Sequence, residues 1–92
     1  MALDIETVEA ILRKHWEMPS NINPKKLSDQ AFKIQVMVAQ KYSHQNLKYQ
    51  LSLIQKTELQ LNFDDRACDR IASDLLTPMA VSPGLRPFSG GD

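Results

Sequence analysis

The stretch PKKLSDQAFKIQVMVAQKYSHQNLKYQLSLIQKT, residues 24–57, decides the fold, because its length as a helix sets the shape of the whole chain. Apolar residues recur at three-to-four spacing along one face of it, at Leu27, Ala31, Ile34, Val38 and Tyr42. A second apolar patch follows at Leu47, Leu51 and Ile54. This periodicity is typical of an amphipathic helix.

The two patches are separated by SHQN, residues 43–46, which is polar but contains neither glycine nor proline. We therefore favour one continuous helix over residues 24–57, with a break near Ser43–Asn46 as the alternative. A continuous helix of this length would extend about 50 Å at 1.5 Å per residue. Since that is too long for a compact monomer of this size, we expect the helix to associate with a partner along its length.

Shorter helices are predicted on both sides of this segment. Residues 4–17 carry an apolar stripe and begin with Asp4, which is a good N-cap. Residues from about 65 to 76 carry another apolar stripe and follow Asp64, a second N-cap. Residues 57–63 are predicted to be a connector whose apolar side chains cover the core. The fold class is therefore all-α: a small three-helix domain, short-long-short, over residues 1–76.

The remaining residues, TPMAVSPGLRPFSGGD at 77–92, hold three of the five prolines and all three glycines. The prolines space out four apolar side chains, at Met79, Val81, Leu85 and Phe88. Such a segment favours an extended, polyproline-like chain that loses little entropy when it binds. We expect this tail to dock on a partner or on a neighbouring subunit.

Charge is unevenly distributed, although the chain is neutral overall. Residues 25–56 carry six lysines and one acid, Asp29. Four of these lysines recur at intervals of seven or eight and would form a band on one side of a continuous helix: Lys26, Lys33, Lys41 and Lys48. They are candidate contacts for a polyanion. The segment has no arginine and the chain is not basic, so a solvated helix face is favoured over nucleic acid.

No catalytic or metal-binding signature is present in the sequence. His15, His44 and Cys68 lack the close spacing of a zinc or redox site. Cys68 lies on an apolar helix face, where a cysteine behaves as a small inert hydrophobe. We therefore expect neither enzymatic activity nor a metal or cofactor.

The cellular setting is inferred from the N-terminus and from cysteine usage. Acidic residues at Asp4, Glu6 and Glu9 stand where a signal peptide has basic ones. No stretch approaches the roughly 18–20 apolar residues of a membrane span. A single cysteine suits a reducing compartment. We expect a soluble intracellular protein, cytoplasmic or within a virion or other assembly.

Two functions are consistent with these features. The favoured one is a non-enzymatic assembly or adaptor protein that associates through its long helix and its tail. Its partner contacts would be Tyr42, Leu47, Leu51 and Ile54, together with the four apolar tail residues. The alternative rests on layout: a short helix, a long central helix, the connector LQLNFDD and a short helix over residues 4–76 resemble the histone fold. That resemblance implies a handshake dimer with DNA contact through Lys25, Lys26 and the lysine-rich central helix.

Overall fold

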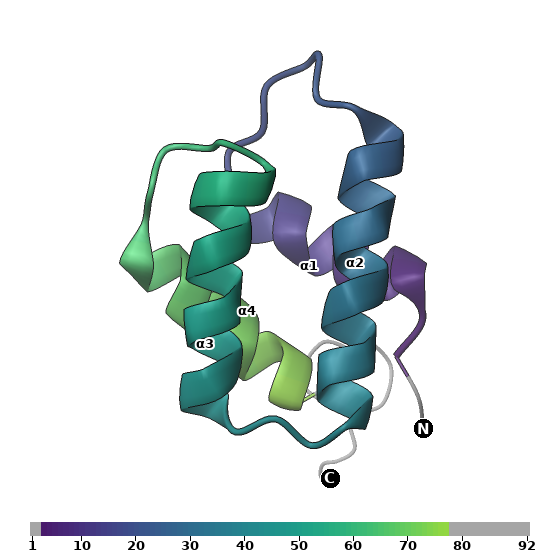
Figure 1. The fold of residues 1–92 in the computed structure, drawn as a ribbon, viewed down its shortest axis with the longest axis vertical. Coiled ribbons are helices and arrows are strands. Elements are labelled where there is room, and N and C mark those ends of the chain that lie inside the picture. Colours follow the sequence, from purple (N-terminus) through teal and green to yellow (C-terminus); the bar gives the residue numbers. More distant parts are fainter. Residues whose placement is uncertain (1–2, 78–92) are drawn as a thin grey trace, which may run out of the picture.

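The computed structural model describes residues 3–77, which form four α-helices and one π-helical segment (Figure 1). The elements are α1 (Ile5–His15), α2 (Pro24–Ala39), α3 (His44–Leu53), η1 (Ile54–Glu58, π-helical) and α4 (Asp65–Leu76). The expectation of a mostly helical domain is confirmed, and no strand occurs within residues 3–77.

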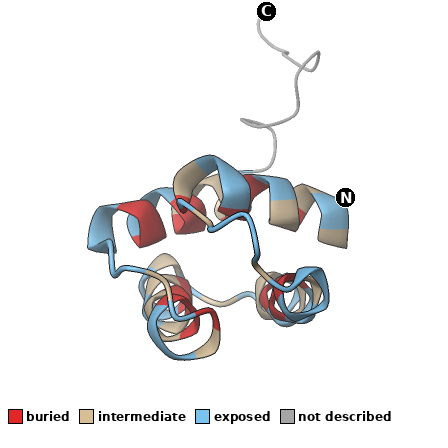
Figure 2. Cartoon of the chain, turned by 90° about the horizontal axis from the view of Figure 1, so that it is seen from above, coloured by how far each residue is buried: buried red, intermediate tan, exposed pale blue. Residues whose placement is uncertain are grey.

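The helices are arranged in two layers (Figure 2). α2 and α3 run antiparallel in one layer, and α1 and α4 cross them in the other (Figures 1 and 2). α1 packs against both α2 and α4, and α4 packs against α3. Since α2 and α3 contact each other much less than they contact α1 and α4, respectively, the second layer holds the first together.

A single hydrophobic core lies between the layers. Every helix contributes buried apolar side chains to one cluster: Val8, Ile11, Leu12, Trp16, Leu27, Ala31, Ile34, Leu47, Leu51, Ile54, Leu59, Ala67, Cys68, Ile71, Ala72 and Leu75. The predicted apolar stripes therefore face one another inside one chain. Burial of this surface is the main favourable contribution to folding.

Side-chain caps begin α1, α2 and α4, and two of these caps are the predicted residues Asp4 and Asp64. Asp4 accepts a hydrogen bond from the Thr7 amide at 2.7 Å, and Asn23 accepts one from the Lys25 amide at 2.9 Å. Asp64 caps α4 by accepting from the amides of its first turn. These bonds satisfy amides that a helix start leaves unpaired. The bounds of α4 coincide with the predicted helix over 65–76.

The predicted continuous helix over residues 24–57 is wrong, because the chain reverses between α2 and α3. Lys41 has a left-handed backbone, with φ of 66°. The Lys41 amide donates to the Val38 carbonyl at 3.0 Å, and the Tyr42 amide donates to the Met37 carbonyl at 3.2 Å. This pair of bonds is a Schellman motif, which ends a helix without needing proline.

A new helix begins directly after this turn. Ser43 Oγ accepts a hydrogen bond from the Asn46 amide at 3.2 Å and caps α3. The break between α2 and α3 therefore lies next to Ser43–Asn46, where the alternative prediction placed it. The short-long-short layout is therefore wrong, and with it the long central helix on which the resemblance to the histone fold depended.

The connector after α3 is shifted relative to the prediction over 57–63. Helical geometry continues to Glu58, and the turn closes with the Leu59 amide donating to the Ile54 carbonyl at 2.9 Å. Leu59 is buried and Leu61 is partly buried, whereas Phe63 is 51% exposed. The connector covers the core only in part. Of the predicted tail over residues 77–92, all but Thr77 lies outside the described residues.

Candidate interaction surfaces

The predicted partner contacts in the central segment lie in or against the core. Leu47, Leu51 and Ile54 are buried, and Tyr42 is partly buried beside them. Their apolar character is explained by packing within one chain, and contact with a partner would require this core to open. Met79, Val81, Leu85 and Phe88 lie outside the described residues, so their docking stays a prediction.

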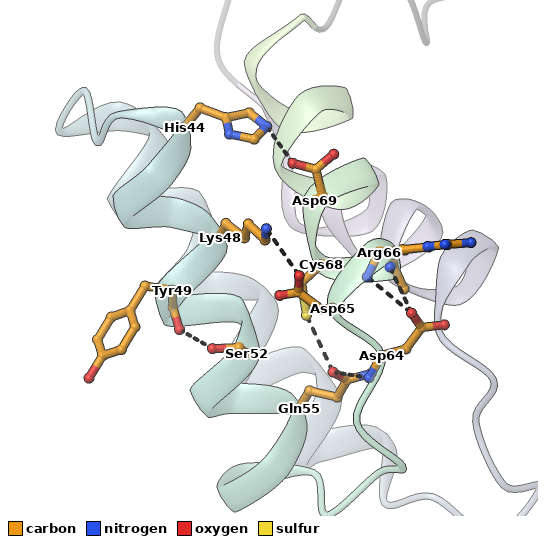
Figure 3. Close-up of polar contacts among 11 residues, drawn as sticks. His44, Lys48, Tyr49, Ser52, Gln55, Asp64, Asp65, Arg66, Cys68 and Asp69 are labelled. Atoms are coloured by element: carbon orange, nitrogen blue, oxygen red, sulfur yellow. Dashed lines mark hydrogen bonds and ion pairs between the residues drawn. The ribbon is translucent and has the colours of Figure 1, made fainter.

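Polar side chains form a seam between α3 and α4 (Figure 3). Lys48 Nζ lies 3.2 Å from Asp65 Oδ2. His44 Nε2 lies 3.1 Å from Ser73 Oγ and 3.4 Å from Asp69 Oδ1. A hydrolytic triad needs the hydroxyl and the carboxylate on opposite ring nitrogens, and here both approach the same one. The seam therefore fixes the position of α4 and has no triad geometry.

A buried glutamine joins η1 to the start of α4. Gln55 Oε1 accepts from the Asp64 amide at 3.1 Å and from Cys68 Sγ at 3.3 Å (Figure 3). Burial raises the pKa of Cys68 to about 11. Because the thiolate is the nucleophilic form, Cys68 is an unreactive neutral thiol at pH 7.

The ends of α1 and α4 are joined by a histidine contact that the sequence reasoning missed. His15 Nε2 lies 2.7 Å from Asp74 Oδ2, and Lys14 Nζ lies 3.9 Å from the same oxygen. The two partners are 59 residues apart in the chain, so no local spacing pattern could have linked them.

The predicted lysine band is divided by the turn between α2 and α3. Lys41 lies in the turn itself, and Lys48 is paired with Asp65. Lys26 and Lys33 remain together on one face of α2, and both are exposed. The structure therefore brings together two of the four candidate polyanion contacts.

The exposed side of α2 borders an open depression of about 860 Å³. Its lining includes Lys26, Lys33 and the 54%-exposed ring of Phe32. Gln30 also lines it but is only 3% exposed. Its Nε2 donates to Glu58 Oε1 at 3.4 Å, while its Oε1 is buried without a partner among residues 3–77. The lining therefore combines three lysines and two carboxylates, Asp29 and Glu58, with an aromatic ring and a buried acceptor.

Two further aromatic rings are exposed elsewhere. Tyr49 on α3 is 60% exposed and points away from α4 (Figure 3). Phe63 in the connector is 51% exposed, and Lys56 Nζ lies 4.9 Å from the centre of its ring. That distance is within the range of a cation–π interaction.

A smaller depression of about 320 Å³ lies where the end of α1 meets η1 and the connector. Trp16, Gln55 and Phe63 line part of it, and its lining has no hydroxyl or thiol side chain. Trp16 Nε1 is buried, with no hydrogen-bond partner among the described residues. Among the described residues, its titratable lining side chains are His15, Glu17 and Asp64.

Within residues 3–77, no three histidine, cysteine or acidic side chains converge as metal ligands do. No helix in that range is both long enough and apolar enough to cross a bilayer.

In comparisons with known proteins, no family model, no curated protein and no solved structure matches this chain. The function is therefore inferred from the surfaces described above.

Proposed function

We propose that the chain is a non-enzymatic assembly or adaptor protein. Its helical domain presents exposed anchor side chains, and its C-terminal tail docks on a partner or on a neighbouring subunit. The observation that supports this proposal is the aromatic ring of Phe32. It is exposed, although the apolar core of the domain is formed within one chain. Exposed aromatic rings beside basic groups are frequent energetic centres of protein interfaces.

The remaining polar clusters favour binding over catalysis. The contacts of His44, Lys48 and His15 are explained by the packing of α4 against its neighbours. The one thiol is buried and protonated at neutral pH. An assembly protein needs neither a nucleophile nor an acid–base pair.

A reducing, intracellular setting fits this proposal, either in the cytoplasm or within a virion or other assembly. Cys68 is the single cysteine of the chain and contributes to the core as a thiol. The tail contributes through Met79, Val81, Leu85 and Phe88, which are spaced by prolines and suited to an extended mode of binding.

The test is the light-scattering mass of the full chain beside a 1–77 truncation over a range of concentrations. We expect the mass of the full chain to rise with concentration and the truncation to stay monomeric. Phe32→Ser in the full chain should weaken the association, whereas Tyr49→Ser is the matched control and should leave it unchanged. A full chain that stays monomeric throughout would contradict self-assembly.

A further inference from the structure

The outer side of α2 carries an apolar stripe that no helix of the described domain covers. Phe32, Val36 and Ala39 are spaced i, i+4 and i+7, which places them on one helix face. Phe32 and Ala39 are exposed, and Val36 is partly exposed. Both α1 and α4 lie on the opposite side of the layer formed by α2 and α3 (Figure 2). We call these three residues the outer α2 stripe.

Two opposite charges flank the outer α2 stripe. Asp29 lies three residues before Phe32, and Lys41 lies two residues after Ala39. Both side chains are exposed. Asp29 is paired with the exposed Lys25 at 3.4 Å, whereas Lys41 forms no ion pair with any residue of 3–77. The stripe is therefore an uncharged surface with a carboxylate at one end and an ammonium group at the other.

The order of these residues makes the outer α2 stripe complementary to itself. When two copies of α2 run antiparallel about a two-fold axis near Val36, Phe32 of each copy lies opposite Ala39 of the other. A large ring then faces a small side chain at both ends of the contact. The same alignment brings Asp29 of each copy near Lys41 of the other, because both lie just beyond the stripe. A parallel pair would instead place Phe32 against Phe32 and like charges against each other.

We propose that the outer α2 stripe binds the outer α2 stripe of a second copy of this chain in an antiparallel arrangement. The assignment rests on the proposed assembly role and identifies the surface that the neighbouring subunit contacts. One helix face is smaller than the roughly 800 Å² per partner that a stable interface buries. A second contact, from the tail, is therefore needed, and two linked contacts strengthen each other. On this account the 1–77 chain stays monomeric.

A charge exchange in the full chain tests this pairing. Asp29→Lys places a like charge opposite Lys41 of the second copy, and Lys41→Asp places one opposite Asp29. Each variant should raise the dissociation constant of self-association, measured by analytical ultracentrifugation, about fivefold. The double variant should return it to within about twofold of the parent value. Within one chain the two residues are on the order of 15 Å apart at 1.5 Å per residue, so this recovery can arise only between copies.

The matched control for the charge exchange combines Asp29→Lys with Arg13→Asp. It has the same net charge as the double variant, but Arg13 is an exposed residue of α1. Its association should stay as weak as that of Asp29→Lys alone. Urea midpoints of all variants should stay close to the parent value, since each change is at an exposed residue and aspartate tolerates the left-handed backbone at position 41.

A size exchange tests the outer α2 stripe independently of charge. Phe32→Ala removes the ring from both ends of the contact, and Ala39→Phe brings two rings into the same space. Each single variant should weaken association about five- to tenfold. The double variant places a ring at position 39 opposite an alanine at position 32 of the other copy, so most of the affinity should return.

Two results would overturn the antiparallel pairing and leave the assembly proposal intact. One is association that Phe32→Ala weakens but neither double variant recovers, which would mean that Phe32 contacts a different surface of its partner. The other is association that no change at positions 29, 39 and 41 affects, which would place the contact outside the outer α2 stripe. A parent chain that stays monomeric at every concentration would instead overturn the self-assembly proposal, and the pairing with it.

Discussion

The backbone amide of Tyr42 donates to the carbonyl of Met37 at 3.2 Å, and this bond closes the turn that divides the central segment. The side chains of both residues are partly buried against the core. Apolar side chains at these two positions commonly accompany a Schellman motif. The chain can therefore return along α3 and fill its own core, so it does not need a second copy along a long helix.

Replacing Lys41 with glycine tests this turn. Lys41 has φ of 66°. This left-handed conformation is unfavourable for a residue that has a Cβ atom, whereas glycine adopts it without that steric penalty. We expect Lys41→Gly to raise the free energy of unfolding by about 0.5–1 kcal/mol in urea titrations.

The matched control is Lys33→Gly, an exposed lysine inside α2. Glycine in a helix interior should lower the free energy of unfolding by about 1 kcal/mol. If Lys41→Gly were destabilising by a similar amount, residue 41 would lie in a continuous helix and the turn would be disproved.

The core position of α3 is tested by Leu51→Ala. Leu51 is fully buried, so we expect a loss of about 2–5 kcal/mol of stability, from lost burial and the cavity left behind. Tyr49→Ala changes an exposed ring on the same helix and should cost much less. Equal losses in the two variants, measured by thermal or urea unfolding, would contradict the assignment of the buried face.

The buried thiol predicts a loss of stability at alkaline pH. The pKa of Cys68 is raised from 9.0 to about 11 in the folded chain. Above pH 9 the unfolded state releases this proton while the folded state keeps it, so stability falls between pH 9 and 11. The contribution is on the order of 2 kcal/mol by linkage.

Cys68→Ala isolates this effect from the other groups that titrate at alkaline pH. The difference in unfolding free energy between the variant and the parent, followed by urea titration at several pH values, should change in the variant's favour above pH 9. A difference that is constant from pH 7 to 11 would show that the thiol has an ordinary pKa when folded.

The contact between His15 and Asp74 predicts a measurable coupling. In a double-mutant cycle with His15→Gln and Asp74→Asn, we expect an interaction free energy on the order of 1 kcal/mol. Its source is the 2.7 Å contact between two partly buried groups. Strict additivity of the two substitutions would mean that the contact does not tie α1 to α4.

Local sequence signals predicted the helix starts well. Asp4 and Asp64 each cap a helix by bonds that span only two or three residues, so neighbouring residues suffice to identify them. The apolar stripes likewise predicted core residues such as Leu27 and Ile34, because burial follows helical periodicity.

The turn at residues 40–43 was missed because its left-handed residue is a lysine. A glycine is the usual marker of such a helix end, and here the only local signal was the capping serine, Ser43. Because of that error, Leu47 and Leu51 were predicted to contact a partner. In an uninterrupted helix these two side chains would have no core within the same chain to pack against.

The lysine-bearing surface of α2 was also predicted only in part, but the reason is different. The spacing of Lys26 and Lys33 places them on one face, and this survives in α2. The contact of Gln30 with Glu58 joins residues 28 positions apart, so it depends on how η1 packs beside α2. No periodic pattern within one helix contains that information.

The central claim is that residues 3–77 form a complete core within one chain. Binding to a partner then involves groups that are not part of this core. Its most direct test is the urea unfolding midpoint of the 1–77 chain over a roughly hundredfold range of protein concentration. A core formed within one chain predicts the same midpoint throughout. A midpoint that rises with concentration would show that Leu47, Leu51 and Ile54 are buried between copies, and would contradict this account.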